Sequence, residues 1–473
     1  MSAHQGEGPG KQASASAHER AGLCCCLLAL CAALLLALGC ARPESPTSKP
    51  MPSVSATPGL PGGNPTPDPR AQERPVATVS PQVMRTLTIW GPDFRAPLDE
   101  SPAGAEFRLQ IQAFEAAHPG WRVEYVRKKP YGQGGLVHFL RATHVVAPEL
   151  LPDLVLVDMS EIGLLAGDSL LQPLDTLLGP EITSDLLPFA REAGQVDGKL
   201  LAVQDEADLR FLAYNSAVMA EPPSTWAEVL ALRTSYLLPI GATEGSVRDA
   251  FLPQYLAVGG KLVDREGQPY LDPALVKAVL EVYQSAREAG LLPAAGLDLK
   301  DAGDCWPVYL TSRVAMTNVS SWDYGRERTS KLANTRVGPL PTLSGNPISL
   351  SSGWGWALIS TSTERQTVAA ELLRALLRPE AMAARCRLTY HLPTRRSALR
   401  LTIDDAAYLE FLERVIEVTV PQPREPAYSL AVKALGPAIE AVAEGELSPE
   451  AAATKAVEAM RTARQEMASG SQP

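Results

Sequence analysis

Apolar positions in the first part of the chain follow strand and helix periods in turn. Residues 86–90 form an apolar, β-favouring run that ends at Gly91-Pro92, which predicts a buried strand and a loop. Phe107, Ile111 and Phe114 recur at helical spacing and predict a helix with one buried face. Alternation over residues 121–125 predicts a half-buried strand, and the apolar run 153–158 is typical of a strand buried on both faces of a parallel sheet. This order of elements predicts an α/β fold.

Helical periodicity dominates the second half of the chain. Asp272 followed by Pro273 is typical of an N-cap and a first helical residue, and Gly290 ends the pattern. Ser448 and Pro449 begin the last helix in the same way. The elements predicted here are helices at 272–290, 363–377 and 448–464, with short strands at 314–317 and 356–360.

An apolar run without charge, residues 23–38, comes directly before Gly39 and Cys40. Such a run behind a sparsely charged start is typical of an export signal. Because it ends on a small residue and a cysteine, it resembles a bacterial lipoprotein signal (1–39), whose cleavage would leave Cys40 as the lipidated N-terminus. The alternative is an uncleaved membrane helix, which needs about 17–25 apolar residues. Both interpretations place the rest of the chain outside the cytoplasm.

Composition separates the segment after the signal from the rest of the chain. Residues 41–84 hold 11 of the chain's 41 prolines and few large apolar side chains. Such a segment cannot bury enough apolar surface to offset its ordering entropy, so 40–84 is predicted to be a spacer that holds the body off the membrane. The body, from about residue 85 to 464, is long enough for two domains, and 465–473 is predicted to be a disordered tail.

Charge and cysteine content narrow the class of protein further. The formal net charge of −10 argues against nucleic-acid binding, which depends on Lys and Arg neutralising phosphates. Of the seven cysteines, only Cys305 and Cys386 lie beyond the proposed anchor. An exported protein could join these two in a disulfide, whereas isolated cysteines more often stay free and buried.

Several weak motifs in the body occur together in the order found in one known family. They include Thr86-Leu-Thr-Ile-Trp90, Pro152-Asp153, Asp197-Gly198-Lys199, Pro223-Ser-Thr-Trp226-Ala-Glu228, Gly353-Trp354 and Leu392-Pro-Thr-Arg395. With the signal, they make the chain resemble the extracellular solute-binding proteins of ABC importers, in the carbohydrate group related to maltose-binding protein. The resemblance implies a type II periplasmic-binding-protein-like fold, with two α/β lobes around a ligand cleft and hinge crossovers.

The resemblance also implies lobe bounds and a function. Crossings near Asn215, Val314 and Leu376 would give an N-lobe of 85–214 and 315–375 and a C-lobe of 217–314 and 376–464. Such a protein would close on a carbohydrate, without a cofactor, a metal or catalysis, and deliver it to ABC permease subunits. The lipid anchor would hold it at the outer face of the cell membrane, close to that permease.

Seven residues are candidate ligand contacts, because they end strands or match cleft positions of the family, where a sugar needs aromatic faces and polar edges. They are Trp90, Asp158, Asp205, Glu206, Trp322, Trp354 and Arg395. Each has an alternative: core packing for the tryptophans, a helix cap for Asp158, a surface ion pair for Arg395 and solvated acids for the other two. Trp226 and Trp306 are expected to be structural.

The chain departs from the family pattern in two segments that face the cleft in relatives. Gln204 stands where Pro is usual, and residues 143–151 replace a Gly-rich stretch. These departures leave room for a ligand other than the common sugars, such as a polyamine, a metal chelate or a peptide. A receptor that presents its ligand to a sensor is a further alternative.

A secreted glycoside-acting enzyme is the main alternative of another class. Paired carboxylates cleave glycosides, but among 53 acidic residues accidental pairs are certain. The sequence holds no G-x-S-x-G, H-E-x-x-H or P-loop motif. His138 and His144 are six residues apart and so do not share a helical face for a metal.

Overall fold

The computed structural model describes residues 84–97, 100–328 and 332–469, all within one compact unit, Val79–Pro473. The predicted signal peptide, Cys40 and all of the predicted linker except Met84 lie outside the described residues. No described helix is long and apolar enough to cross a bilayer.

The first sheet has five strands in the order β2-β1-β3-β12-β6. β1 pairs in parallel with β2 and β3, whereas β12 runs antiparallel to β3 and β6. The sheet is therefore mixed, and the predicted strands at 86–90, 121–125 and 153–158 are confirmed. Its strands are β1 (Arg85–Pro92), β2 (Trp121–Lys128), β3 (Leu154–Asp158), β6 (Ala202–Gln204) and β12 (Trp354–Leu358).

Helices cover both faces of this sheet. Because successive side chains of a strand point to opposite faces, β3 contributes to the core on both sides. In β3, Leu154 and Leu156 belong to the core cluster formed with α2 (Pro102–Ala117) and α13 (Thr363–Leu376). The alternate residues Val155 and Val157 belong to the cluster formed with α3 (Leu136–Val146) and α4 (Ile162–Gly167). All four side chains are buried, as the uninterrupted apolar run predicts.

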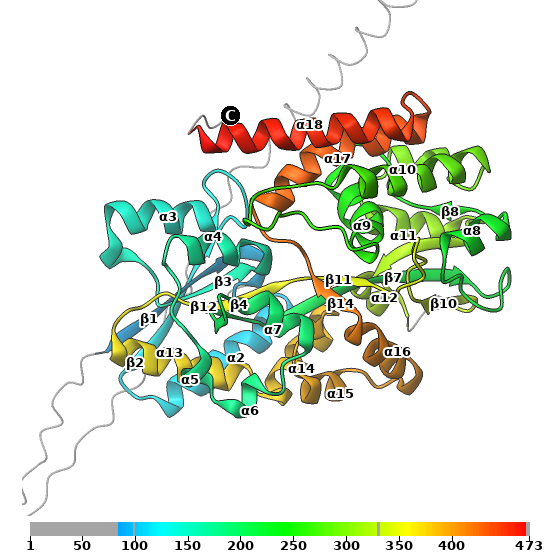
Figure 1. Cartoon of the computed structure of the whole chain (residues 1–473). Coiled ribbons are helices and arrows are strands. Elements are labelled where there is room, and N and C mark those ends of the chain that lie inside the picture. Colours follow the sequence, from blue (N-terminus) through cyan, green and yellow to red (C-terminus); the bar gives the residue numbers. More distant parts are fainter. Residues whose placement is uncertain (1–83, 98–99, 329–331, 470–473) are drawn as a thin grey trace, which may run out of the picture. The chain divides into compact units, whose positions relative to one another are not determined.

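The second sheet has seven strands, five of them in the order β14-β11-β7-β9-β8, with β10 and β13 also paired to β7. It lies to the right of the first sheet in Figure 1. The strands are β7 (Glu206–Asn215), β8 (Tyr236–Leu237), β9 (Met316–Ser320), β10 (Thr335–Gly338), β11 (Ser349–Ser352), β13 (Leu392–Pro393) and β14 (Thr419–Pro421).

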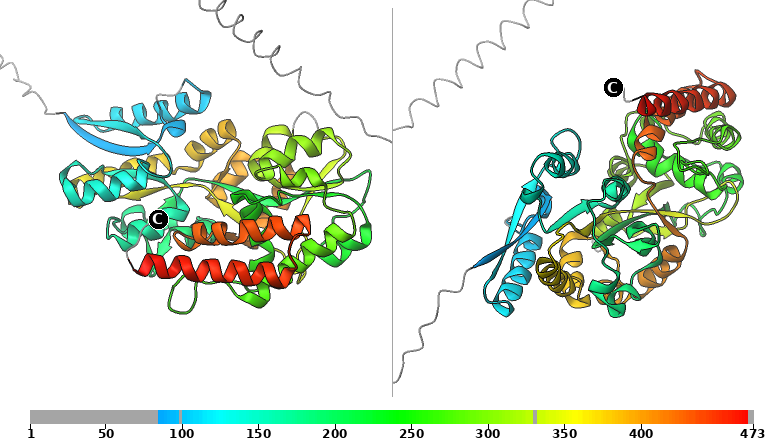
Figure 2. Two further views of the ribbon diagram at one scale, coloured as in Figure 1. Left: turned by 90° about the horizontal axis from the view of Figure 1, so that it is seen from above. Right: turned by 60° about the vertical axis from the view of Figure 1, so that its left-hand side comes forward.

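Three long helices build the largest core cluster beside the second sheet. They are α10 (Pro273–Glu288), α17 (Ala427–Glu444) and α18 (Pro449–Ala468), and both views of Figure 2 show α17 and α18 side by side. Asp272 caps α10 by accepting hydrogen bonds from the backbone N–H groups of Ala274 and Leu275, which confirms the predicted helix start. α18 continues through Ala468, beyond the predicted end at Arg464 and into the predicted tail.

Shorter elements connect these layers. They are η1 (Asp93–Arg95), η2 (Pro148–Leu150), η3 (Met159–Glu161), α5 (Asp175–Leu178), α6 (Pro180–Thr183), α7 (Pro188–Gly194), β4 (Gln195–Val196), β5 (Lys199–Leu200), α8 (Trp226–Leu232), η4 (Ser246–Phe251), α9 (Leu252–Ala257), η5 (Ala294–Leu297), α11 (Ala302–Thr311), α12 (Ser321–Glu327), α14 (Pro379–Thr389), α15 (Arg396–Thr402) and α16 (Ala406–Glu417). A hydrogen-bonded capping box formed by Thr225 and Glu228 begins α8.

The points where the chain changes sheets differ from the predicted lobe bounds. β7 and the strands between residues 316 and 352 belong to the second sheet, although both stretches were expected in the N-lobe. Conversely, Leu376, Met382 and Ala398 lie in the core of the first sheet, although the second segment of the C-lobe was expected to begin at Leu376. The expected bounds came from the family resemblance, and the sequence pattern could not correct them, because periodicity does not encode the hydrogen-bonded neighbour of a strand.

Cys305 and Cys386 are both free and buried, on α11 and α14. The disulfide alternative is therefore wrong for this structure. Burial raises the pKa of both thiols well above the ordinary range, which leaves little thiolate at neutral pH. Trp226 and Trp306 are also buried, as expected of structural residues.

We predict that neither Cys305 nor Cys386 reacts with iodoacetamide in the native protein, because each thiol is buried and protonated. Both should react after unfolding in guanidinium. Peptide mapping by mass spectrometry identifies each site separately, so the cysteines outside the described residues do not interfere. Rapid native labelling of either residue, or a disulfide-linked peptide pair, would contradict the prediction.

Candidate functional site

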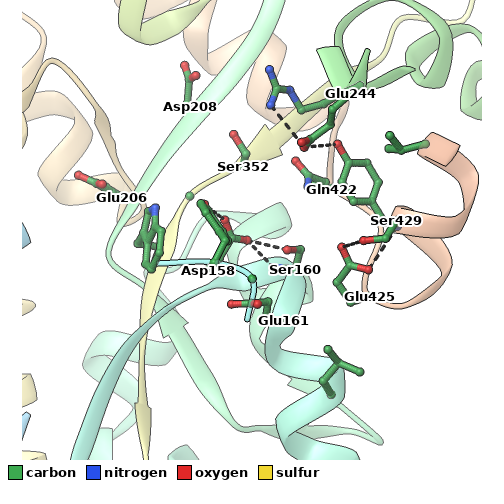
Figure 3. Close-up of a pocket in the computed structure, with 18 of the residues that line it drawn as sticks. Asp158, Ser160, Glu161, Glu206, Asp208, Glu244, Ser352, Gln422, Glu425 and Ser429 are labelled. Carbon is green, nitrogen blue, oxygen red and sulfur yellow. Dashed lines mark hydrogen bonds and ion pairs between the residues drawn. The ribbon is translucent and has the colours of Figure 1, made fainter. Parts of the chain in front are cut away.

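A cavity of about 710 Å³ lies between segments from the two sheets (Figure 3). The first sheet contributes the end of β3 and the start of β12, together with η3 and the loop before α3. The opposite wall comes from η4, from the segment after β14 and from α17. Lining side chains that carry chemistry are Tyr131, Asp158, Ser160, Glu161, Glu206, Asp208, Glu244, Arg248, Trp354, His391, Gln422, Glu425, Tyr428, Ser429 and Lys433.

The floor of the cavity forms where the chain passes from β11 to β12. Gly353 makes this turn with φ at +154°, and a Cβ there would lie 2.1 Å from the carbonyl oxygen of Glu206. Only glycine allows the two segments to approach so closely. Trp354, the next residue, pairs in register with Asp158 at the end of β3. An aromatic ring and a carboxylate from distant parts of the sequence are thereby brought to one wall.

Trp354 lies between two other aromatic rings. Its ring centroid is 5.3 Å from that of Phe94, which meets it edge-on, and 5.6 Å from that of Tyr131. Phe94 and Tyr131 are both exposed, whereas Trp354 is largely buried. Trp354 and Tyr131 give the cavity an aromatic wall, and Phe94 packs against Trp354 outside the lining.

Asp158 caps a short helix, which was the alternative to its predicted ligand contact, and it also lines the cavity. Its Oδ1 accepts hydrogen bonds from the backbone N–H (2.9 Å) and the hydroxyl (2.7 Å) of Ser160, which caps η3. Its Oδ2 accepts a hydrogen bond of 2.8 Å from the hydroxyl of Tyr131. The side chain also lines the cavity, so helix capping and exposure to a ligand coexist.

Glu206 and Asp208 reach the cavity from β7, where alternate residues share a face. Glu206 forms an ion pair with Arg95, and Asp208 accepts a hydrogen bond of 2.6 Å from Arg210. Burial alone would raise the pKa of Asp208, but the charge of Arg210 and several hydrogen bonds lower it below its ordinary value. Asp208 is therefore held ionised, and the ion pair with Arg95 fixes the position of the Glu206 carboxylate.

Glu161, in η3, has the most perturbed carboxyl group of the lining. Its Oε2 is buried and has no hydrogen-bond partner among the described residues. Burial, together with the negative charges of Asp158 and Glu425, raises its pKa from 4.5 to about 8. Glu161 is therefore protonated at neutral pH, and it lies beside Asp158 and Glu425, whose negative charges favour this protonated form.

The opposite wall holds its acidic and aromatic groups in one network. Glu244 accepts a hydrogen bond of 2.9 Å from the hydroxyl of Tyr428 and lies 3.8 Å from Arg248. Arg248 donates in turn to both oxygens of Asp249, at 2.7 and 2.9 Å. The charge of this arginine is thus already matched by a buried carboxylate.

Two of the seven predicted ligand contacts, Trp90 and Asp205, lie outside the cavity lining. Trp90 faces the α3 side of β1, where the ammonium group of Lys128 lies 4.0 Å from its ring centroid. Asp205 accepts a hydrogen bond of 2.6 Å from Arg385 and forms an ion pair with Arg95. As ligand contacts, both stay predictions.

Trp322 and Arg395 also have other partners. The indole N–H of Trp322 donates to the carbonyl of Thr389, and its ring centroid lies 6.1 Å from that of His391, which does line the cavity. Arg395 donates to the carboxylate of Asp185 at 2.9 Å and to two backbone carbonyls, which engages its guanidinium. Asp158, Glu206 and Trp354 are thus the predicted residues that the structure brings together.

Sequence reasoning missed most of the wall opposite Trp354. The polar alternation of Glu206, Asp208 and Arg210 signals a strand with one charged face and could have revealed Asp208. Tyr428 has no comparable signal, because an aromatic residue in a helical pattern is indistinguishable from core. Among the described residues, no group of metal-ligating side chains could hold a metal ion.

Comparison with known proteins decides the family. Residues 110–408, more than half of the chain, match the model of the bacterial extracellular solute-binding proteins. The chain belongs to this family. This confirms the predicted resemblance, and the family places the chain among extracytoplasmic solute-binding proteins.

Individual solute-binding proteins are similar over different extents. A maltotriose-binding protein of Pyrococcus abyssi is 31% identical over 88 residues, which is 19% of each chain. The match therefore spans only about a fifth of that relative. The structure resembles the cyclic α-maltosyl-1,6-maltose-binding protein of Arthrobacter globiformis (TM-score 0.65, 18% identity, 81% of this chain and 100% of that one). It also resembles the maltose-bound MalE3 protein of T. maritima (TM-score 0.61, 18% identity, 80% and 99%). These likenesses confirm the type II periplasmic-binding-protein-like fold.

We predict that Glu161→Gln stabilises the protein progressively as pH rises. Between about pH 4.5 and about pH 8 the unfolded chain ionises at this position while the folded protein keeps the proton. The protonated Glu161 side chain therefore makes its full contribution to stability below its pKa in the unfolded chain, 4.5, and this contribution is lost as pH rises toward 8. The variant's melting temperature, relative to the natural protein, should increase from about pH 5 to about pH 8. The exposed carboxylate Glu149 gives a matched control, and a pH-independent difference for Glu161→Gln would contradict the prediction.

Proposed function

We propose that this protein is the substrate-binding lipoprotein of an ABC importer, which binds a carbohydrate between its two sheets and delivers it to a membrane permease. The single observation that carries the proposal is the cavity in which aromatic rings and carboxylates face one another. The names of similar proteins from P. abyssi and A. globiformis, which bind maltotriose and a cyclic maltosyl sugar, support the ligand class.

The chemistry of a sugar matches both kinds of lining group. A pyranose has C–H faces, which pack on aromatic rings such as Trp354, Tyr131 and Tyr428. Its hydroxyl groups donate to carboxylates, of which six line the cavity: Asp158, Glu161, Glu206, Asp208, Glu244 and Glu425. The volume of about 710 Å³ lies within the usual range of small-molecule sites.

The two walls also suggest how ligand binding would be signalled. Tyr131 and Trp354 belong to the side of the first sheet, whereas Tyr428 and Glu425 lie on or just before α17. A ligand that touches both walls stabilises the closed form relative to the open one, in proportion to its difference in affinity for the two. Closure would present the loaded protein to a permease without altering the sugar, so we propose no enzymatic activity.

The membrane tether completes the proposal. The apolar run 23–38 followed by Gly39 and Cys40 supports export and lipidation at Cys40, and the Pro-rich segment supports a spacer. Anchoring at the outer face of the cell membrane would raise the effective concentration of the protein near its permease.

We predict that the protein binds at least one neutral or amine-bearing oligosaccharide, measured by titration calorimetry, and returns it unchanged in chromatography. Trp354→Ala should weaken this binding by about 2 kcal/mol, or roughly thirty-fold, because it removes the central ring of the aromatic wall. Binding requires both walls, so closure should also reduce the radius of gyration in X-ray scattering.

Trp322→Ala provides the matched control, since Trp322 lies outside the cavity lining but contacts His391. It should weaken binding less than Trp354→Ala, and circular dichroism verifies that both variants fold. Unchanged affinity in Trp354→Ala would remove the aromatic wall from the site. Turnover of a glycoside would replace the transport proposal by an enzymatic one.

We predict that Cys40→Ser releases the protein from membranes. In a bacterial host, the natural chain should incorporate radiolabelled palmitate and sediment with membranes, because two or more acyl chains give stable anchoring. Cys31→Ser, within the apolar run, is the matched control and should leave labelling intact. Membrane association of Cys40→Ser without label would favour an uncleaved N-terminal helix instead.

A further inference from the structure

Three carboxylates at one end of the cavity have no cationic partner among the described residues. They are Asp158, Glu161 and Glu425, and Figure 3 shows them facing the same space. Asp158 is hydrogen-bonded to Ser160 and Tyr131, and Glu425 accepts from the hydroxyl (2.6 Å) and backbone N–H (3.2 Å) of Ser429. All of these partners are neutral, so they orient the carboxylates but leave their charge uncompensated.

The other three acids of the same cavity provide an internal comparison. Glu206 and Asp208 form ion pairs with Arg95 and Arg210, respectively. Glu244 lies 3.8 Å from Arg248, whose charge is already matched by Asp249, and it accepts a hydrogen bond from Tyr428. The two acids on β7 therefore have cationic partners, whereas the cluster of three has none in the described part of the chain. Burying an unpaired charge costs stability, so an unpaired cluster in a ligand cavity favours a partner that comes with the ligand.

The cations near the unpaired cluster are not available to it. Arg424, which precedes Glu425, donates to the backbone carbonyls of Glu192, Ala193 and Gln195. Lys433 lines the cavity from α17, but its side chain is exposed to solvent. Neither side chain forms an ion pair with the three acids within the described part of the chain.

A second, independent feature of this end is a buried acceptor without a donor. Gln204 is 1% exposed, and its Nε2 donates to the carbonyls of Glu206 (3.1 Å) and Ser352 (3.3 Å), which fixes its Oε1 as an acceptor. This Oε1 has no partner in the described structure. Gln204 lines a small cavity of about 10 Å³, room for about one water-sized group, which shares Asp158 and Ser160 with the large one.

The unpaired groups define the chemistry of what would satisfy them. Glu161 Oε2 lacks a donor, and an ammonium group offers three donors and no acceptor. Gln204 Oε1 belongs to the small neighbouring cavity, which has room for about one water-sized group. A metal ion is a poorer match, because the described residues contain no group of ligands arranged to hold one. The faces of the adjacent Tyr131 and Trp354 rings attract cations and also pack against a sugar ring. These rings therefore favour an organic cation that carries a sugar ring.

We propose that the ligand is a saccharide that carries a protonated amine, with the amine held by Glu161, Asp158 and Glu425 and the sugar ring against Trp354 and Tyr131. The inference rests on the proposed carbohydrate-binding function and specifies its ligand class. A neutral sugar brings no cation to these acids, whereas an ammonium group pairs with Asp158 and Glu425 and favours the ionised form of Glu161.

Proton linkage provides a signature of this arrangement. The groups that face Glu161 are Asp158, Glu425, the phenols of Tyr131 and Tyr428 and, farther along α17, Lys433. Burial and the two carboxylates raise the pKa of Glu161 to about 8, and a bound ammonium would lower it again. Binding of the amine at neutral pH therefore releases a proton, whereas binding of a neutral sugar does not.

Calorimetry with matched sugars tests the proposal. Amine-bearing mono- and oligosaccharides are each compared with their N-acetylated and hydroxyl counterparts at neutral pH, in two buffers of different ionisation enthalpy. At least one amine should bind about ten-fold or more tightly than both neutral partners, with proton release. In Glu161→Gln the ratio of amine to neutral-sugar affinity should fall about ten-fold and the proton release should disappear, whereas Glu149→Gln should behave as the natural protein.

The outcomes separate this inference from the function on which it rests. Neutral sugars that bind as tightly as their amine counterparts in every set would overturn the amine proposal and leave the carbohydrate function standing. Absence of binding by every saccharide of either kind would overturn both. If Glu161→Gln does not fold, the proton release measured on the natural protein decides between the same alternatives.

Discussion

The close approach of two chain segments at Gly353 is the constraint on which the site depends. β6 leads into β7 and β11 leads into β12 at the same place, and Gln204 ties the two passages together through the carbonyls of Glu206 and Ser352. A side chain at Gly353 would collide with the carbonyl oxygen of Glu206. Both passages join the same two sheets. They therefore fix the position at which Trp354 pairs with Asp158, and with it the position of the candidate ligand site.

Buried ion pairs then set the charge pattern around this junction. Asp205 and Glu206 share Arg95, and Asp205 also binds Arg385. On the far side, Arg210 bridges Asp208 and Asp249, and Asp249 also receives Arg248. Burial alone would raise the pKa of Asp249, but Arg248 and Arg210 lower it well below its ordinary value. Such networks contribute little net stability, but they orient carboxylates in a way that hydration could not.

Local patterns were sufficient to predict the layers of the fold but not the connections between them. The buried strand 154–158, the helix carrying Phe107 and the cap at Asp272 were all recoverable, because each depends on the period or capping of neighbouring residues. Which sheet a strand joins depends on distant partners, and so β7 and β9 were expected in the wrong layer. The family resemblance supplied the fold, which no single motif in the sequence determines.

The candidate site likewise contains some residues that local patterns predict and others that they do not. Asp158 and Trp354 were predictable because they end or begin strands at the sheet edge, where ligands bind. Glu161, Glu425 and Tyr428 come from helical or irregular segments and are brought together only by tertiary packing. Arg395 resembles a cleft residue in sequence, yet its guanidinium is committed to Asp185 and to backbone carbonyls. Sequence alone cannot distinguish a committed arginine from a free one, because the difference lies in partners that are far away along the chain.

The imbalance of charge in the cavity also determines which solutes it rejects. Six lining carboxylates face Arg248 and Lys433, and the chain as a whole carries a net charge of −10. The field of such a surface disfavours the approach of anions before any contact forms. Phosphorylated or carboxylated solutes would bring like charge to Asp158 and Glu425 and would keep Glu161 protonated, which is a repulsive element of selectivity. For the proposed ligand, the same acids would favour a cation, and the aromatic wall would provide an apolar face for its ring.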